Sequence, residues 1–161
     1  MKAGYHRAAD LDDVLRKAGE LGAKTLVFDV EPLVAHWDNG QDALDRGVAE
    51  VVAKAAAVPG VAVVCFATNS LRRPTALPSD AGVRVVYLAG ARKPLWTAPY
   101  ADFPRPGAVI GDQVATDGLL ARRLGYTFLH YWPPGFHLPW GPRLLHYSGR
   151  AVRPFVFGAK D

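Results

Sequence analysis

The sequence has little of what would place it in several common classes of protein. It contains one cysteine, Cys65, so no disulfide can form within the chain and a reducing compartment is expected. No apolar run reaches the roughly 20 residues needed to cross a bilayer, so no transmembrane segment is expected. The N-terminus has no apolar stretch of the secretory kind, which favours a cytoplasmic location.

The sequence also has no large excess of positive or negative residues. The chain has 19 Lys+Arg against 15 Asp+Glu, a formal net charge of +4. This mild excess favours anionic ligands in general, and no nucleic-acid partner is expected. Half of the 161 residues are hydrophobic, which suits one domain with its own core. We expect that core in residues 1–131, and a tail rich in proline, aromatic and basic residues, packed on it, in 132–161.

Five short segments have the composition of buried strands. They are nearly continuous in apolar and β-branched residues, which is typical of parallel strands covered on both faces. The predicted strands are 24–30, 61–67, 83–88, 108–111 and 126–131. Apolar residues at helical spacing predict helices over 10–21, around 44–55 and over 116–124, whereas 89–106 and the tail are expected to be irregular. This alternation predicts an α/β fold with a doubly wound, mostly parallel, five-stranded, Rossmann-like sheet.

Polar residues interrupt the apolar pattern where the predicted strands end. Asp29 closes the first strand, Thr68 follows the second, and Lys93 comes shortly after the third. Asp112 follows the fourth strand, with Asp117 five residues further on. Because open parallel sheets bind ligands at the carboxyl ends of their strands, these side chains are expected to share one site.

That set of residues suits phosphoryl transfer. A carboxylate can attack phosphorus and form an aspartyl-phosphate. A second carboxylate can share a Mg²⁺ ion with it, since Mg²⁺ prefers oxygen ligands. Lysine, threonine and backbone N–H groups can hold the phosphoryl oxygens as charge redistributes.

The same residues lie in four segments that resemble a known superfamily. Segments 28–31 (FDVE), 66–69 (FATN), 92–94 (RKP) and 109–117 (VIGDQVATD) are similar to the four motifs of haloacid dehalogenase (HAD) superfamily phosphatases, in the same order. The last segment looks like that of the capless subclass IIIA, which contains YqeG-like and phosphatidylglycerophosphate phosphatases. The resemblance covers residues 24–131, and the intervals between the motifs leave no room for a cap domain.

The resemblance implies a role for each residue. Asp29 would be the nucleophile and a Mg²⁺ ligand, Asp112 a second Mg²⁺ ligand, and Glu31 a further ligand through its backbone carbonyl. Phosphate would be held by Thr68, Asn69 and Lys93, with Asp117 and Gln113 in support. It also implies adjacent first and fourth strands, and a substrate that is a phosphorylated small molecule or a phospholipid head group. The chain would then be a Mg²⁺-dependent phosphomonoester hydrolase, and an oligomer is possible.

One position departs from the family pattern. The acid/base residue two positions after the nucleophile is usually Asp, and here it is Glu31, followed by Pro32. Glutamate has the same proton chemistry but reaches one methylene further, and proton transfer depends on hydrogen-bonding distance. Three outcomes stay open: Glu31 works after a local adjustment, turnover is slow, or the domain has kept only phosphate and metal binding and acts through partners.

Other interpretations of these residues stay open as well. Each Asp or Thr could merely cap a helix or form a turn, and a receiver-type signalling domain also uses Asp, Thr and Lys at such an edge. In a receiver the acidic pair closes the first strand, whereas here it follows the fourth. Residues 36–38 (HWD) could line the substrate entrance or form a plain surface loop. Cys65 is expected in the core, and the irregular spacing of His130, His137 and His146 predicts no metal site.

Overall fold

The computed structural model describes residues 4–79, 81–131, 149 and 151–158, and within them a single parallel sheet organises the chain. Its strand order is β1-β6-β5-β2-β3-β4, and every neighbouring pair is parallel. The strands are β1 (Tyr5–Ala8), β2 (Thr25–Asp29), β3 (Val63–Thr68), β4 (Arg84–Ala89), β5 (Gly107–Gly111) and β6 (Thr127–Tyr131). The α/β prediction is therefore confirmed, and all five predicted strands are present.

The predicted strand number was wrong, because the sheet has a sixth strand at its edge. β1 pairs with β6 in parallel, from Tyr5 opposite Phe128 to Ala8 opposite Tyr131. Its burial runs from half-buried through two exposed residues to buried Ala8, so it lacks the continuous apolar character that marked the other strands. β4 forms the opposite edge, where Arg84 is exposed and the other residues are only partly buried.

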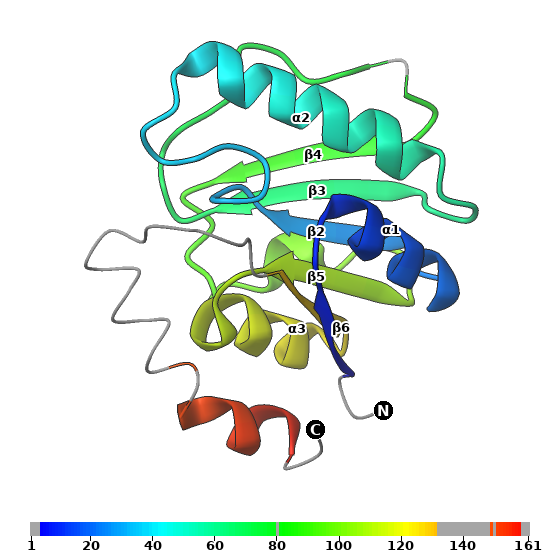
Figure 1. Cartoon of the computed structure of the whole chain (residues 1–161), viewed down its shortest axis with the longest axis vertical. Coiled ribbons are helices and arrows are strands. Elements are labelled where there is room, and N and C mark those ends of the chain that lie inside the picture. The colour runs from blue at the N-terminus through cyan, green and yellow to red at the C-terminus, as the bar shows by residue number, and fades with distance from the viewer. Residues whose placement is uncertain (1–3, 80, 132–148, 150, 159–161) are drawn as a thin grey trace.

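Helices cover both faces of the sheet (Figure 1). α1 (Leu11–Glu20) begins at Asp10, whose Oδ1 accepts a hydrogen bond from the Asp13 amide at 2.8 Å. α2 (Gln41–Ala56) and α3 (Leu119–Leu124) complete the set of predicted helices. The third differs from the prediction at its start, where Val114–Gly118 form a π-helical turn, η2. A short 3₁₀ helix, η1 (Ala98–Tyr100), lies in the crossover where no helix was predicted.

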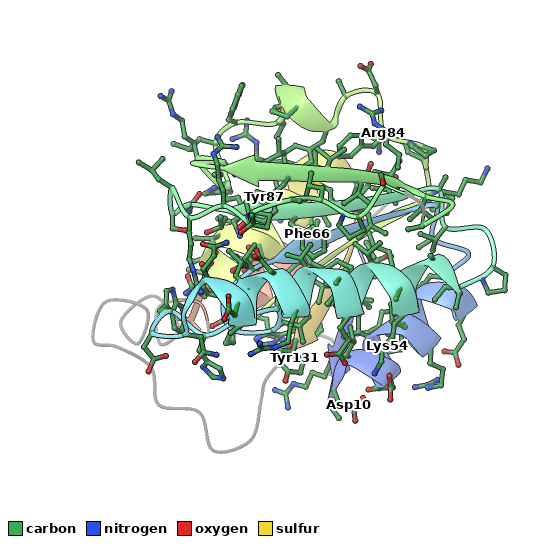
Figure 2. All side chains as sticks on the ribbon, turned by 90° about the horizontal axis from the view of Figure 1, so that it is seen from above. Asp10, Lys54, Phe66, Arg84, Tyr87 and Tyr131 are labelled. Atoms are coloured by element: carbon green, nitrogen blue, oxygen red, sulfur yellow. The ribbon has the colours of Figure 1, made fainter. Side chains whose placement is uncertain are left out.

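Strand residues alternate between two apolar layers. Phe28 and Phe66 point to the side of α1 and α2, and Figure 2 shows Phe66 and Tyr87 between α2 and the sheet. Cys65 and Phe128 belong to the second layer, which contains α3 and η1. Cys65 is buried, as expected. Because both faces are covered, the central strands bury side chains in both directions, which explains their continuous apolar sequence.

Most of the predicted tail, including His137 and His146, lies outside the described residues. Residues 151–157 are helical, so the prediction of an irregular tail is wrong for that stretch. Arg122 of α3 donates hydrogen bonds to the carbonyls of Phe155 and Val156 at 2.9 and 2.8 Å. The ring of Phe157 stacks on Phe128 with centroids 5.7 Å apart. The helix therefore packs beside α3 and β6. No helix within the described ranges is long and apolar enough to cross a membrane.

The strand order reverses at the centre of the sheet, between β2 and β5. After β2 the chain moves outward through β3 to β4, then returns to the other side of β2 as β5. The first and fourth predicted strands correspond to β2 and β5. Their predicted adjacency is confirmed, since Phe28 of β2 pairs with Ile110 of β5. Open α/β sheets bind ligands at the carboxyl ends of the strands at such a point. Among the described residues, α2 is the only helix between β2 and β3, and none separates β3 from β4.

The loop after β2 reaches α2 at a glycine, and this contact predicts opposite effects for two helical glycines. A Cβ at Gly47 would lie 2.0 Å from the Val34 carbonyl oxygen, whereas a Cβ at Gly19 in α1 would meet only a Val58 methyl at 3.5 Å. We expect Gly47→Ala to destabilise the protein by about 1–3 kcal/mol because the loop must move. Gly19→Ala should be neutral or stabilising by up to about 1 kcal/mol. Urea unfolding measures both, and an equal effect of the two substitutions would contradict the packing described.

Candidate active site

The predicted site residues come together at the carboxyl edge of the sheet. Asp29 and Thr68 end β2 and β3, Asp112 directly follows β5, and Lys93 lies four residues after β4. A pocket of about 170 Å³ opens there. It is lined by Asp29, Glu31, Trp37, Thr68, Asn69, Ser70, Lys93, Gln113 and Thr116. Ser70 and Thr116 were not singled out from the sequence, although each lies within four residues of a predicted site residue.

A buried lysine joins two carboxylates beneath the pocket. Lys93 Nζ lies 2.7 Å from Asp29 Oδ1 and 2.7 Å from Asp117 Oδ1. The side chains are 3%, 12% and 0% exposed for Lys93, Asp29 and Asp117. Burial alone would lower the pKa of Lys93, but the two carboxylates outweigh it and raise that pKa above its usual value. Lys93 is therefore a fixed positive charge beside Asp29.

The backbone of Lys93 is held by hydrogen bonds as well. Asn69 Oδ1 accepts a hydrogen bond from the Lys93 amide at 2.7 Å, and Asn69 Nδ2 donates to the Lys93 carbonyl at 3.3 Å. Asn69 was predicted to bind phosphate, and in the structure its amide group orients the lysine. Arg92, just before it, adopts a φ of 52°, a left-handed conformation that is uncommon outside glycine.

Three carboxylates crowd around the same point. One oxygen each from Asp29, Asp112 and Asp117 can be chosen so that all three lie within 4.8 Å of one another. Burial, followed by the charge of Asp117, raises the pKa of Asp29 well above its usual value despite Lys93. The same two causes raise the pKa of Asp112 to about 8. With one ammonium among three carboxylates, ionising all of them needs further positive charge.

Asp112 is the carboxylate best suited to a cation. It is 0% exposed, and neither Oδ1 nor Oδ2 has a hydrogen-bond partner in the described part of the chain. Asp117 differs, because its Oδ1 accepts from Lys93 and its Oδ2 lies 3.4 Å from the Gln113 amide. Buried carboxylate oxygens without donors fit a hard divalent ion such as Mg²⁺. The donor set therefore fits Mg²⁺ at Asp29 and Asp112, with Asp117 orienting Lys93.

Glu31 is anchored through one of its two carboxylate oxygens. Thr68 Oγ1 donates a hydrogen bond to Glu31 Oε2 at 2.8 Å, and Thr68 Oγ1 in turn accepts from the Ser70 amide at 3.0 Å. Glu31 is 4% exposed, and its Oε1 has no partner among the described residues. The longer side chain thus reaches the hydroxyl predicted to hold phosphate.

A close backbone approach allows Asp117 to take its place. A Cβ at Gly111 would lie 2.3 Å from Asp117 Oδ2, so only glycine fits at this end of β5. Behind Asp112, its carbonyl oxygen lies 2.9 Å from His130 Nε2. A carbonyl can only accept, so Nε2 carries the hydrogen, and the hydroxyl of Tyr5 lies 2.7 Å from Nδ1. No sequence pattern pointed to this contact of His130.

Comparison of the chain with protein-family models, with curated proteins and with solved structures gives no match. The functional conclusion therefore rests on the geometry of the site.

The raised pKa of Asp112 predicts how stability depends on pH. In the unfolded chain the Asp112 carboxyl loses its proton near pH 4, whereas the folded state retains it up to about pH 8. Between these values the folded state binds more protons, so without metal the free energy of unfolding should fall as the pH rises. Mg²⁺ should restore more stability at pH 8 than at pH 5. Urea unfolding with EDTA or Mg²⁺ measures both effects.

The control for this prediction is a neutral side chain of the same shape. Asp112→Asn should flatten the fall in stability and remove most of the Mg²⁺ effect, whereas Asn at exposed Asp102 should leave both unchanged. Identical pH profiles for wild type and Asp112→Asn would contradict the proposed protonation of Asp112.

Proposed function

We propose that this protein is a Mg²⁺-dependent phosphomonoester hydrolase in which Asp29 is the nucleophile. The observation that carries the proposal is the position of its carboxylate, which ends β2, lines the pocket and lies 2.7 Å from Lys93. The proposal agrees with the resemblance of the four sequence segments to the motifs of HAD phosphatases. A phosphorylated small molecule or a phospholipid head group is the proposed substrate class, and no cap domain covers the site in the described part of the chain.

In the first half-reaction, an Asp29 oxygen attacks the phosphorus atom of the ester. A bond forms between that oxygen and phosphorus, the bond from phosphorus to the ester oxygen breaks, and the leaving oxygen takes a proton from Glu31. Lys93 orients Asp29 and offsets charge on the phosphoryl oxygens. Mg²⁺ held by Asp29, Asp112 and the Glu31 carbonyl would supply positive charge that keeps the nucleophile ionised.

In the second half-reaction, ionised Glu31 takes a proton from a water molecule that attacks phosphorus. The bond between phosphorus and the Asp29 oxygen breaks, so inorganic phosphate leaves and both carboxylates return to their starting forms. The anchoring of Oε2 by Thr68 supports this role, because Oε1 is left without a hydrogen-bond partner among the described residues. The extra methylene of glutamate is thus used to reach the Thr68 hydroxyl.

A second candidate function rests on a specific feature of the same contacts. The Thr68 hydroxyl and the Lys93 ammonium, both expected to hold phosphate, already contact carboxylates of this chain. This arrangement favours a phosphate- or metal-binding module with little turnover that acts through partners. Glu31→Asp separates the two functions. The shorter side chain would lose its hydrogen bond with Thr68, and phosphate release would rise only if that contact had suppressed turnover.

The first test is phosphate release from a broad panel of phosphomonoesters, with and without Mg²⁺. We expect release that requires Mg²⁺ and disappears in Asp29→Asn, because an amide cannot form the covalent intermediate. Asp38→Asn, which changes an exposed carboxylate in the following loop, is the matched control and should keep full activity. Undiminished release by Asp29→Asn would rule out this nucleophile.

The second test concerns the proton donor. Glu31→Gln keeps the side-chain length but cannot give or take the proton, so kcat/KM, which reports the first half-reaction, should fall by about 10²–10⁴. The loss should be smaller for an ester whose leaving group is a weak base, such as 4-nitrophenyl phosphate, than for an alkyl ester. Steady-state kinetics with both esters measure this, and an equal loss for the two would argue against Glu31 as the acid.

A further inference from the structure

Among the described residues, the pocket is lined by one apolar side chain. Eight of the nine lining residues are polar or charged, and the ninth is Trp37. Four of the polar members are buried, namely Glu31, Thr68, Lys93 and Gln113, whereas Trp37 is half-buried and lines the same pocket. We propose that Trp37 determines substrate specificity by packing against a flat ring in the leaving group, close to the phosphoryl group. This inference rests on the proposed function, whose site it deepens.

The size of the pocket limits what can lie between the phosphoryl group and Trp37. Its volume of about 170 Å³ is close to that of a protein cavity that holds one benzene molecule. A phosphoryl group beside Lys93 and Thr68 leaves space for few further atoms before the indole is reached. We therefore expect the ring to lie close to the ester oxygen. An indole face binds flat aromatic or sugar rings better than a flexible chain, since a ring loses less conformational entropy when it stacks.

The loop that carries Trp37 is fixed from two sides. At its start, the amides of Val34 and Ala35 both donate to the Val30 carbonyl, at 2.9 and 3.1 Å. Further along, Arg72 from the loop after β3 donates to the His36 carbonyl at 2.8 Å, to the Asn39 carbonyl and to the Gly40 carbonyl at 3.2 Å.

These three acceptors flank Trp37 in the sequence, so the guanidinium group holds the backbone on both sides of the indole. The Arg72 carbonyl itself accepts a hydrogen bond from the Tyr87 hydroxyl at 3.1 Å, which ties the arginine to β4. A side chain held in place before the ligand arrives binds with a smaller entropic cost. Arg72 is thus a positioning residue that acts through Trp37.

Binding of phosphonates, which cannot be hydrolysed, tests the inference separately from turnover. In 2-phenylethylphosphonate a CH₂ group replaces the ester oxygen of benzyl phosphate, and pentylphosphonate is the matched ligand without a ring. Calorimetry with Mg²⁺ should show about 10-fold tighter binding of the phenyl compound. Trp37→Ala should abolish this preference by weakening only the phenyl compound, and Trp37→Phe should retain most of it. Inorganic phosphate should compete with both ligands.

Matched variants locate the effect. Trp96→Ala removes a 48% exposed tryptophan outside the pocket and should keep the wild-type preference. Arg72→Ala should reduce the preference, whereas Arg73→Ala, which removes the same charge at the next position, should not. Binding of glucose 6-phosphate to Asp29→Asn, which is not expected to hydrolyse it, tests the recognition of a sugar ring. If Trp37→Ala weakens the binding of only one of the two ligands, glucose 6-phosphate or the phenyl compound, that ligand shows whether a sugar ring or an aromatic ring is recognised.

The outcomes separate this inference from the proposed function. A ring preference that depends on Trp37, without phosphate release from any ester, would overturn the hydrolase proposal and leave the recognition of a ring intact. Phosphate release with equal loss of both phosphonates in Trp37→Ala would overturn the specificity role. That role is also overturned if neither phosphonate binds, if phosphate does not compete, or if Trp96→Ala has the effect expected of Trp37→Ala.

Discussion

The site depends on one ammonium group shared by two buried carboxylates. Lys93 lies 2.7 Å from both Asp29 and Asp117, and almost none of the three side chains is exposed. Breaking such a buried pair by removing one partner leaves an uncompensated charge and typically costs about 3–5 kcal/mol. Several other features serve this contact. Asn69 binds the lysine backbone through both of its amide atoms, and Gly111 gives the Asp117 carboxylate room to approach.

The charge balance around Lys93 also links metal binding to the ionisation of Asp29 in the proposed mechanism. One ammonium cannot offset three carboxylates, so the pKa values of Asp29 and Asp112 are raised by burial and by Asp117. A protonated Asp29 is a poor nucleophile. In the proposed mechanism, cation binding and activation of Asp29 are therefore a single linked equilibrium, in which the loss of protons accompanies the gain of a metal.

Much of this arrangement could be predicted from the sequence, for a physical reason. The central strands are buried on both faces, so their apolar runs are conspicuous, and parallel strands deliver their last residues to one edge. That is why Asp29 and Thr68 can be placed together from the sequence alone. β1 has no comparable signal, since an edge strand with two exposed residues needs no apolar run. The π-helical turn at Val114–Gly118 was missed because its residues fit a helical spacing equally well.

Contacts between side chains were the part that the sequence could not supply. The hydrogen bond from Thr68 to Glu31 depends on the reach of one methylene, and the contact of His130 with Asp112 depends on a register that no pattern encodes. From the sequence, Trp37 could belong to an entrance or to a surface loop. Its place is decided by Arg72, which is distant in sequence and binds three carbonyls of that loop.

The position of β1 has a consequence for how the protein is made. Tyr5 meets its partner His130 across 125 positions of sequence, and that histidine supports the carbonyl of Asp112. The pair cannot form until β6 has been synthesised, although β2, β3 and β4 can already associate. During synthesis β1, which precedes the other described strands of the sheet in sequence, therefore waits longest for its partner, and its pairing with β6 closes the sheet behind the site.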